Sequence, residues 1–161
     1  MSDRIKIRRA SRYDLASVAS MINKGRELGG FLQHASRCTA SSLAAYMKKM
    51  RAFYPYYMLV LDIDGDVRGY VDFCELDGGV GYLIGIFIRQ DNRRRGRGAK
   101  LLQQALKLLR NRGCHKVRSE VYITNQPAAL FCKREGFVKE GLLRNDEGHH
   151  TLVIWSKTLA K

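Results

Sequence analysis

A basic, glycine-containing turn between a strand and a helix has the residue types of a phosphate-binding site. Residues 84–88 are apolar and favour a strand, and Gly96 and Gly98 allow close backbone approach to a ligand. Apolar residues of the helix that follows are Leu101, Leu102, Ala105, Leu108 and Leu109. The first amides of that helix have no intrahelical acceptor, and the helix dipole adds partial positive charge there. Basic side chains around them are Arg93, Arg94, Arg95, Arg97 and Lys100. The segment predicts a pyrophosphate cradle, with a basic solvated loop as the alternative.

The spacing of the glycines distinguishes between known phosphate-binding motifs. The sequence contains no G-x-x-x-x-G-K-[ST] run, and Leu101 stands where a G-x-G-x-x-G turn needs its third glycine. The pattern present is R-x-x-G-x-G-A, formed by Arg93, Gly96, Gly98 and Ala99. It resembles the acetyl-CoA-binding signature of the GCN5-related N-acetyltransferases, the GNAT superfamily.

A second segment, residues 117–137, supports the same resemblance. Alternating apolar residues at 117–123 predict a strand, and Asn125 is a suitable N-cap for a helix that ends at Gly136. This resembles the family motif N-x-x-A-x-x-[LF]-Y-x-K-x-G-F. The residues in register are Asn125, Ala128, Phe131, Gly136 and Phe137. Two motifs in the expected order extend the resemblance over nearly the whole chain.

The remaining periodicity predicts one α/β domain over residues 1–161. The expected helices are 11–23, 39–53, the helix after the glycine turn and the helix after Asn125. The expected strands are 5–7, 56–63, 67–76, 80–89, 117–123, 141–144 and 150–157. The resemblance implies the order βααβββαβαββ. It also implies a mixed, mostly antiparallel sheet with a splayed parallel strand pair, flanked by helices.

Composition excludes several other classes of protein. The chain is 45% apolar with few prolines, which supports a folded core. No apolar run approaches a membrane span, and the N-terminus has no secretory signal. Four dispersed cysteines without a CxxC pair indicate reduced thiols in a cytoplasmic protein. The four histidines show no metal-ligand spacing, so we expect no metal site.

The resemblance implies how acetyl-CoA would bind. The backbone of Ile86, Phe87 and Ile88 would pair with the pantetheine arm. The amides of residues 94–99 would hold the pyrophosphate, with Asn125 and Phe131 on the far side of the arm. The implied reaction is direct transfer of an acetyl group to an amine. This reaction needs a base for the ammonium, amides that polarise the thioester carbonyl, and an acid for the departing thiolate.

The position of the general acid departs from the family pattern. The second motif usually has a tyrosine there, and this chain has Cys132. A thiol with an ordinary pKa near 8.5 can protonate a thiolate of similar acidity, so Cys132 is a candidate acid. The alternative is that Cys132 only fills space on its helix. In that case the proton would come from water or from another tyrosine, Tyr122 or Tyr82.

The general base also departs from the family pattern. Members often carry a glutamate near the start of the strand before the cradle, where this chain has Tyr82. Acidic alternatives are Asp72, Glu75 and Asp77, together with Glu120 on the strand after the cradle helix. A solvent-facing role for Glu120 and base catalysis through ordered water are the other interpretations. The candidate catalytic residues are therefore Cys132, Glu120 and Tyr82.

The net charge of +14 bears on the amine acceptor. Outside the cradle segment from Arg89 to Lys100, 23 basic residues still face 14 acidic ones, so acetyl-CoA accounts for only part of the excess. An anionic partner such as the ribosome, tRNA or an acidic protein is one interpretation, and a generally basic proteome is the other. The leading acceptor is a peptide or protein amine, an N-terminus or a lysine. Aminoacyl-tRNA, a polyamine and a non-catalytic CoA- or nucleic-acid-binding module are alternatives, and the chain is expected to be a monomer or homodimer.

Overall fold

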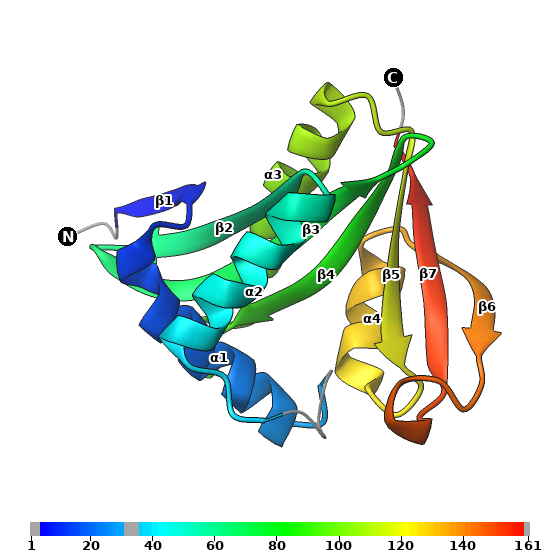
Figure 1. Ribbon diagram of the computed structural model, residues 1–161, viewed down its shortest axis with the longest axis horizontal. Helices are drawn as coiled ribbons and strands as arrows, with labels where there is room; N and C mark the ends of the chain where they lie inside the picture. Colours follow the sequence, from blue (N-terminus) through cyan, green and yellow to red (C-terminus); the bar gives the residue numbers. More distant parts are fainter. Residues whose placement is uncertain (1–3, 31–35, 160–161) are drawn as a thin grey trace.

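One seven-stranded sheet runs through residues 4–30 and 36–159, the part of the chain that the computed structural model describes (Figure 1). The strands lie in the order β1-β2-β3-β4-β5-β7-β6, and only β4 and β5 are parallel neighbours among them. The strands are β1 (Ile5–Arg9), β2 (Tyr56–Ile63), β3 (Asp66–Leu76), β4 (Val80–Ile88), β5 (Lys116–Tyr122), β6 (Val138–Leu143) and β7 (Leu152–Thr158). The predicted mixed, mostly antiparallel sheet is confirmed.

Helices cover both faces of the sheet. They are α1 (Leu15–Glu27), α2 (Ala40–Phe53), α3 (Arg97–Asn111) and α4 (Gln126–Arg134), with short 3-10 turns η1 (Arg12–Asp14), η2 (Gln90–Asn92) and η3 (Glu147–His149). Figure 1 shows α1 and α2 in front of the sheet and α3 and α4 behind it. Each pair buries its own apolar cluster against the sheet. Within the described residues, no helix is long and apolar enough to cross a membrane.

The predicted order of elements is confirmed, but some boundaries differ. The helix expected at 11–23 begins at Leu15, because residues 12–14 form the tighter turn η1, and it continues to Glu27. Strand β6 begins at Val138 rather than at residue 141. Both differences lie at element ends, where local sequence signals are weakest.

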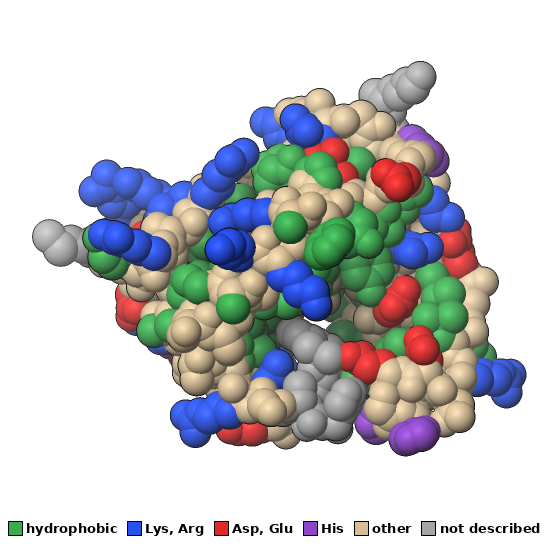
Figure 2. All heavy atoms as spheres, in the orientation of Figure 1, with side chains coloured by type: hydrophobic (Ala, Val, Ile, Leu, Met, Phe, Trp, Pro, Cys, Tyr) green, Lys and Arg blue, Asp and Glu red, His purple; other side chains and the backbone are tan. Residues whose placement is uncertain are grey.

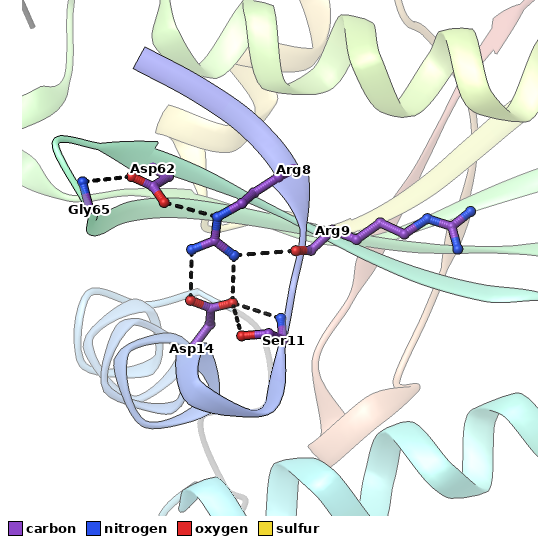
Figure 3. Close-up of polar contacts among 6 residues, drawn as sticks. All are labelled: Arg8, Arg9, Ser11, Asp14, Asp62 and Gly65. Atoms are coloured by element: carbon purple, nitrogen blue, oxygen red, sulfur yellow. Dashed lines mark hydrogen bonds and ion pairs between the residues drawn. The ribbon is translucent and has the colours of Figure 1, made fainter. Parts of the chain in front are cut away.

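A polar network fixes the start of α1 against the sheet (Figure 3). The Arg8 guanidinium donates to both Asp14 oxygens at 2.8 and 3.0 Å and to Asp62 Oδ2 at 2.9 Å. The backbone N–H of Ser11 also donates to Asp14, at 2.7 Å. These donors lower the pKa of Asp14 to about 2, with the Arg8 hydrogen bond as the largest cause. The network joins β1, η1 and β2.

The parallel pair β4–β5 is short and opens into a gap. Its paired residues are Val80 with Lys116, Gly81 with Val117 and Tyr82 with Arg118. Figure 1 shows the two strands diverging beyond these pairs toward their carboxyl ends. The rest of β4 therefore has one edge hydrogen-bonded to β3 and one edge without a strand partner. This confirms the splayed pair that the resemblance implies.

Candidate active site

The turn between β4 and α3 is built as an anion site. Gly96 precedes the helix with φ +69 and ψ 3, a left-handed conformation that glycine adopts without a steric penalty. Arg94 also has a positive φ of 57, and such alternation turns neighbouring amides toward one side. Because α3 begins at Arg97, the amides of Gly98 and Ala99 lie in its first turn. A Cβ on Gly96 would meet no atom within 4 Å, so this surface is open to a ligand.

The predicted arginines of the cradle divide into two groups. The Nε of Arg93 donates to the carbonyl of Ile88 at 2.8 Å, so this side chain ties the turn to the end of β4. Arg97 is buried and hydrogen-bonded to Asn92 of η2, which braces the turn from inside. Arg93, Arg94 and Arg95 are all exposed, so all three contribute charge to the surface of the turn. Arg93 and Arg97 in addition maintain its shape through their hydrogen bonds.

Backbone groups of β4 face the gap at alternate residues. The Arg89 N–H donates to the carbonyl of Arg68, so these two residues form a hydrogen-bonded pair of the β3–β4 ladder. Along an antiparallel ladder, hydrogen-bonded pairs alternate with pairs whose backbone groups point away from the partner strand. Ile86 and Ile88 therefore direct their N–H and C=O groups away from β3, into the gap, while those of Phe87 point toward β3. Of the three residues expected to pair with pantetheine, Ile86 directs both backbone groups into the gap, whereas the Ile88 carbonyl already accepts the Arg93 Nε. Phe87 instead supports Arg93, whose guanidinium lies 5.0 Å above its ring centre.

Helix α4 closes the far side of the gap. The side-chain oxygen of Asn125 accepts the Ala128 N–H at 3.2 Å. This hydrogen bond caps the N-terminus of α4. The Phe131 ring packs against the first turn of α3, where a Cβ on Gly98 would lie 3.4 Å from it. Gly98 therefore permits the close approach of α3 and α4. Of the two predicted residues, Phe131 therefore lies against the cradle helix, and Asn125 caps α4.

Two of the three predicted catalytic residues meet where the parallel strands separate. The Tyr82 hydroxyl donates to Glu120 Oε2 at 3.0 Å. Burial is the largest cause that raises the pKa of Tyr82, and Glu120 raises it further. The phenol is therefore protonated at neutral pH and can act as a hydrogen-bond donor to the carboxylate.

Cys132, the third predicted catalytic residue, lies on the opposite side of the sheet. It is 5% exposed and belongs to the apolar cluster under α3 and α4, whereas Tyr82 packs against the cluster under α1 and α2. Burial raises the pKa of its thiol to about 11. This is the environment that the space-filling interpretation requires. The tyrosine alternative Tyr122 donates to Glu147 at 3.1 Å.

The other acidic candidates occupy different environments. Asp72 is buried on the α1–α2 face and accepts the Tyr56 hydroxyl at 3.0 Å. Burial raises the pKa of Asp72 to about 7. Glu75 is engaged by the Tyr57 hydroxyl at 2.7 Å and by Arg112 at 2.9 Å. Asp72 is among the candidates from the sequence, but the sequence does not indicate its partner Tyr56. Tyr70 and Cys74, two residues to either side of Asp72 on β3, are buried against α1 and α2, and the period of two along a strand is the signal that places the Asp72 side chain on the same face.

A cavity of about 820 Å³ adjoins the cradle, between α1 and the end of β4. Its cationic lining residues are Lys24, Arg26, Arg37, Arg89 and Arg93, and its acidic one is Glu27. Figure 2 shows Lys and Arg side chains concentrated over β1 and α2, whereas several Asp and Glu side chains lie toward β5 and β7. The two sides of this face therefore differ in charge. Within the described residues, no group of three His, Cys, Asp or Glu side chains is arranged to hold a metal ion.

Comparison with known proteins agrees with this geometry. Residues 30–137 match the model of the acetyltransferase (GNAT) family. A Bacillus subtilis (strain 168) protein assigned as an alanine N-acetyltransferase of ribosomal protein bS18 is 27% identical over 106 residues, 63% of this chain and 69% of that protein. The chain belongs to the GNAT family and is an acetyl-CoA-dependent N-acetyltransferase.

Solved structures share the fold. A ribosomal-protein-alanine N-acetyltransferase from Brucella melitensis superposes with a TM-score of 0.79 at 19% identity, covering 96% of this chain and 99% of that one. An acetyltransferase from Salmonella typhimurium, yncA, solved with its cofactor acetyl-CoA, has a TM-score of 0.78 at 18% identity, covering 98% and 95%. At these identities the likeness concerns the fold.

The residues present fit acetyl-CoA. The open surface at Gly96 and the first amides of α3 suit a pyrophosphate, and the unpaired edge of β4 suits an amide-containing arm. When bound, acetyl-CoA supplies an activated acetyl thioester.

Proposed function

We propose that this enzyme acetylates the α-amine of a protein N-terminus, with a ribosomal protein as the acceptor. The observation that carries the chemistry is the Tyr82–Glu120 hydrogen bond at the point where β4 and β5 separate. The choice of acceptor is supported by the Bacillus subtilis relative, assigned to ribosomal protein bS18. The basic surface over β1 and α2 is compatible with a ribosome-associated acceptor.

In this proposal Glu120 accepts the proton of the incoming ammonium group. The neutral amine then attacks the thioester carbon, a C–N bond forms, and the C–S bond breaks with its electron pair remaining on sulfur. The nitrogen then loses its second proton to solvent and becomes the neutral amide, and the protonated Glu120 returns the first proton through the Tyr82 hydroxyl to the thiolate. Backbone amides at the open edge of β4 polarise the thioester carbonyl. Atoms and charges balance without a proton from Cys132, which we assign a packing role.

The proposal is tested by thiol release from acetyl-CoA with a panel of amines. The panel contains peptides with free Ala or Ser N-termini, the same peptides with blocked N-termini and an internal lysine, a polyamine and a charged tRNA. We expect turnover of the free N-terminal peptides. Preference for the lysine peptide, the polyamine or the tRNA would contradict the proposed acceptor. Acetyl-CoA binding without turnover of any amine would support a non-catalytic module.

The matched variants are Glu120→Gln and Glu140→Gln. The first removes the proposed base and should lower kcat by about 100-fold, within the usual range for general-base removal. The second removes an exposed carboxylate that pairs with Lys116 at 2.7 Å on the far strand of the sheet, and should leave kcat unchanged. Equal rates for the two variants would contradict the role of Glu120.

A further inference from the structure

Strand β4 contains a bulge at the start of its open edge. Its register with β3 shifts so that Phe73 faces Leu83 while Asp72 faces Gly85, which leaves Ile84 as the extra residue. The ladder with β5 ends immediately before, at Tyr82. A bulge re-aims the residues that follow it, and bulges are over-represented beside active sites. Here the bulge sets the direction in which the open edge of β4 faces the gap.

A buried serine holds the bulge from the β5 side. Ser119 is 6% exposed, and its hydroxyl donates to the carbonyl of Leu83 at 3.0 Å. Ser119 directly follows Arg118, the last β5 residue paired with β4. The side chain therefore replaces the backbone hydrogen bond that the diverging strands no longer make. It marks the point from which the gap widens.

A buried aspartate lies on the β3 side of the same bulge. Asp72 is 5% exposed and accepts the Tyr56 hydroxyl, and the amide of Gly85 also favours its ionised form. Among the described residues, no Lys or Arg forms an ion pair with it. Burying a carboxylate without a cation is costly, so its presence points to a function beyond stability.

Buried polar side chains are concentrated along this strand and its turn. Apart from tyrosines and cysteines, the buried polar or charged residues among those described are Asp14, Asp72, Asn92, Arg97, Ser119 and Ser156. Two of the six flank the bulge, and two more brace the cradle turn through the Asn92–Arg97 hydrogen bond. This distribution matches the path expected for acetyl-CoA rather than a general feature of the core.

We propose that Asp72 and Ser119 are positioning residues that clamp the β4 bulge from both sides and hold the backbone of residues 83–86 against the acetyl thioester. The inference rests on the acetyl transfer proposed above. In this proposal Asp72 and Ser119 act on the acetyl-transfer step, whereas the cradle turn before α3 provides the affinity for CoA. Loss of the clamp should therefore lower kcat more than it weakens CoA binding.

Ser119→Ala provides the first test. We expect kcat to fall by about tenfold, the Kd for CoA measured by calorimetry to change less than twofold, and Ser119→Thr to restore kcat. Amide hydrogen exchange of Gly85, which faces Asp72 directly after the bulge, should become about fivefold faster, which corresponds to the loss of one hydrogen bond. Ser156→Ala removes another buried hydroxyl, on β7, and is the control for the loss of a buried hydroxyl away from the bulge.

The aspartate is tested with a conservative and an apolar substitution. Asp72→Asn keeps an acceptor oxygen and should retain most of kcat, whereas Asp72→Leu should lose it. The proposal would be overturned if Ser119→Ala and Asp72→Leu both had the kcat and the exchange rates of wild type. It would also be overturned if Ser119→Ala and Ser156→Ala lowered kcat by the same factor. If wild-type protein acetylates no amine, the proposed function fails, and the hydrogen-exchange comparison still decides whether Ser119 holds the bulge.

Discussion

Asp72 couples the stability of this fold to pH. Burial raises its pKa from 3.8 to about 7, so the folded protein holds this proton more tightly than the unfolded chain does. Each unit of pKa difference is worth about 1.4 kcal/mol, which makes the full effect about 4 kcal/mol. Because the folded pKa is the higher one, the contribution is complete below about pH 4 and is lost as the pH rises through about 7.

Asp72→Asn removes this titration and keeps a side chain of the same shape. The free energy of unfolding of the variant, relative to that of wild type, should therefore increase by about 4 kcal/mol between pH 4 and pH 8. Urea unfolding followed by the fluorescence of Trp155, the single tryptophan, measures this difference at each pH. Equal m-values in the two proteins would show that the same transition is compared.

Asp14→Asn is the control of opposite sign. Arg8 and Ser11 lower the pKa of Asp14 to about 2, so its contribution is complete above about pH 4 and is lost only as the pH falls through about 2. This variant should be destabilised by a constant amount between pH 4 and pH 8. A difference between Asp72→Asn and wild type that does not change over the same range would refute the reasoning about Asp72.

Two further predictions concern the packing cysteine and the cradle. Cys132→Ala should lower the free energy of unfolding by about 1 kcal/mol, as expected for a small buried truncation. It should change kcat less than twofold. A tenfold fall in kcat at matched stability would instead identify Cys132 as the general acid. Gly96→Ala places a Cβ on a residue with φ +69 and should weaken CoA binding by about tenfold in calorimetry. Gly98→Ala, with its Cβ 3.4 Å from Phe131, should have a smaller effect, and equal effects would contradict the role of Gly96.

Features encoded within short segments could be predicted from the sequence. The cradle is a strand, a glycine turn and an amphipathic helix in one continuous stretch, and α3 was therefore expected where it occurs. The helix begins later than expected because the Ser11–Asp14 capping box encloses a 3-10 turn, and Asp14 is also held by Arg8 of β1. Short-range periodicity does not report such contacts.

The contacts that complete the site join residues distant in sequence. Tyr56 and Asp72 are 16 positions apart, Ser119 and Leu83 are 36 apart, and Tyr82 and Glu120 are 38 apart. Each depends on strand register and on which face of the sheet a side chain occupies. A shift of one residue would reverse that face, so local patterns do not specify these partners. Cys132 illustrates the same limit, because its position in the motif does not reveal that its thiol lies on the other side of the sheet from Tyr82.

The short β4–β5 ladder has a mechanical consequence. Three residue pairs join the strands β1–β4 to the strands β5–β7, whereas the neighbouring antiparallel ladders on either side are longer. The backbone pairing of the sheet is therefore weakest between β4 and β5, where the gap lies. Small rotations about this ladder change the width of the gap while the ladders within each half stay paired. Backbone pairing therefore opposes a change in the width of the gap less here than at any neighbouring ladder.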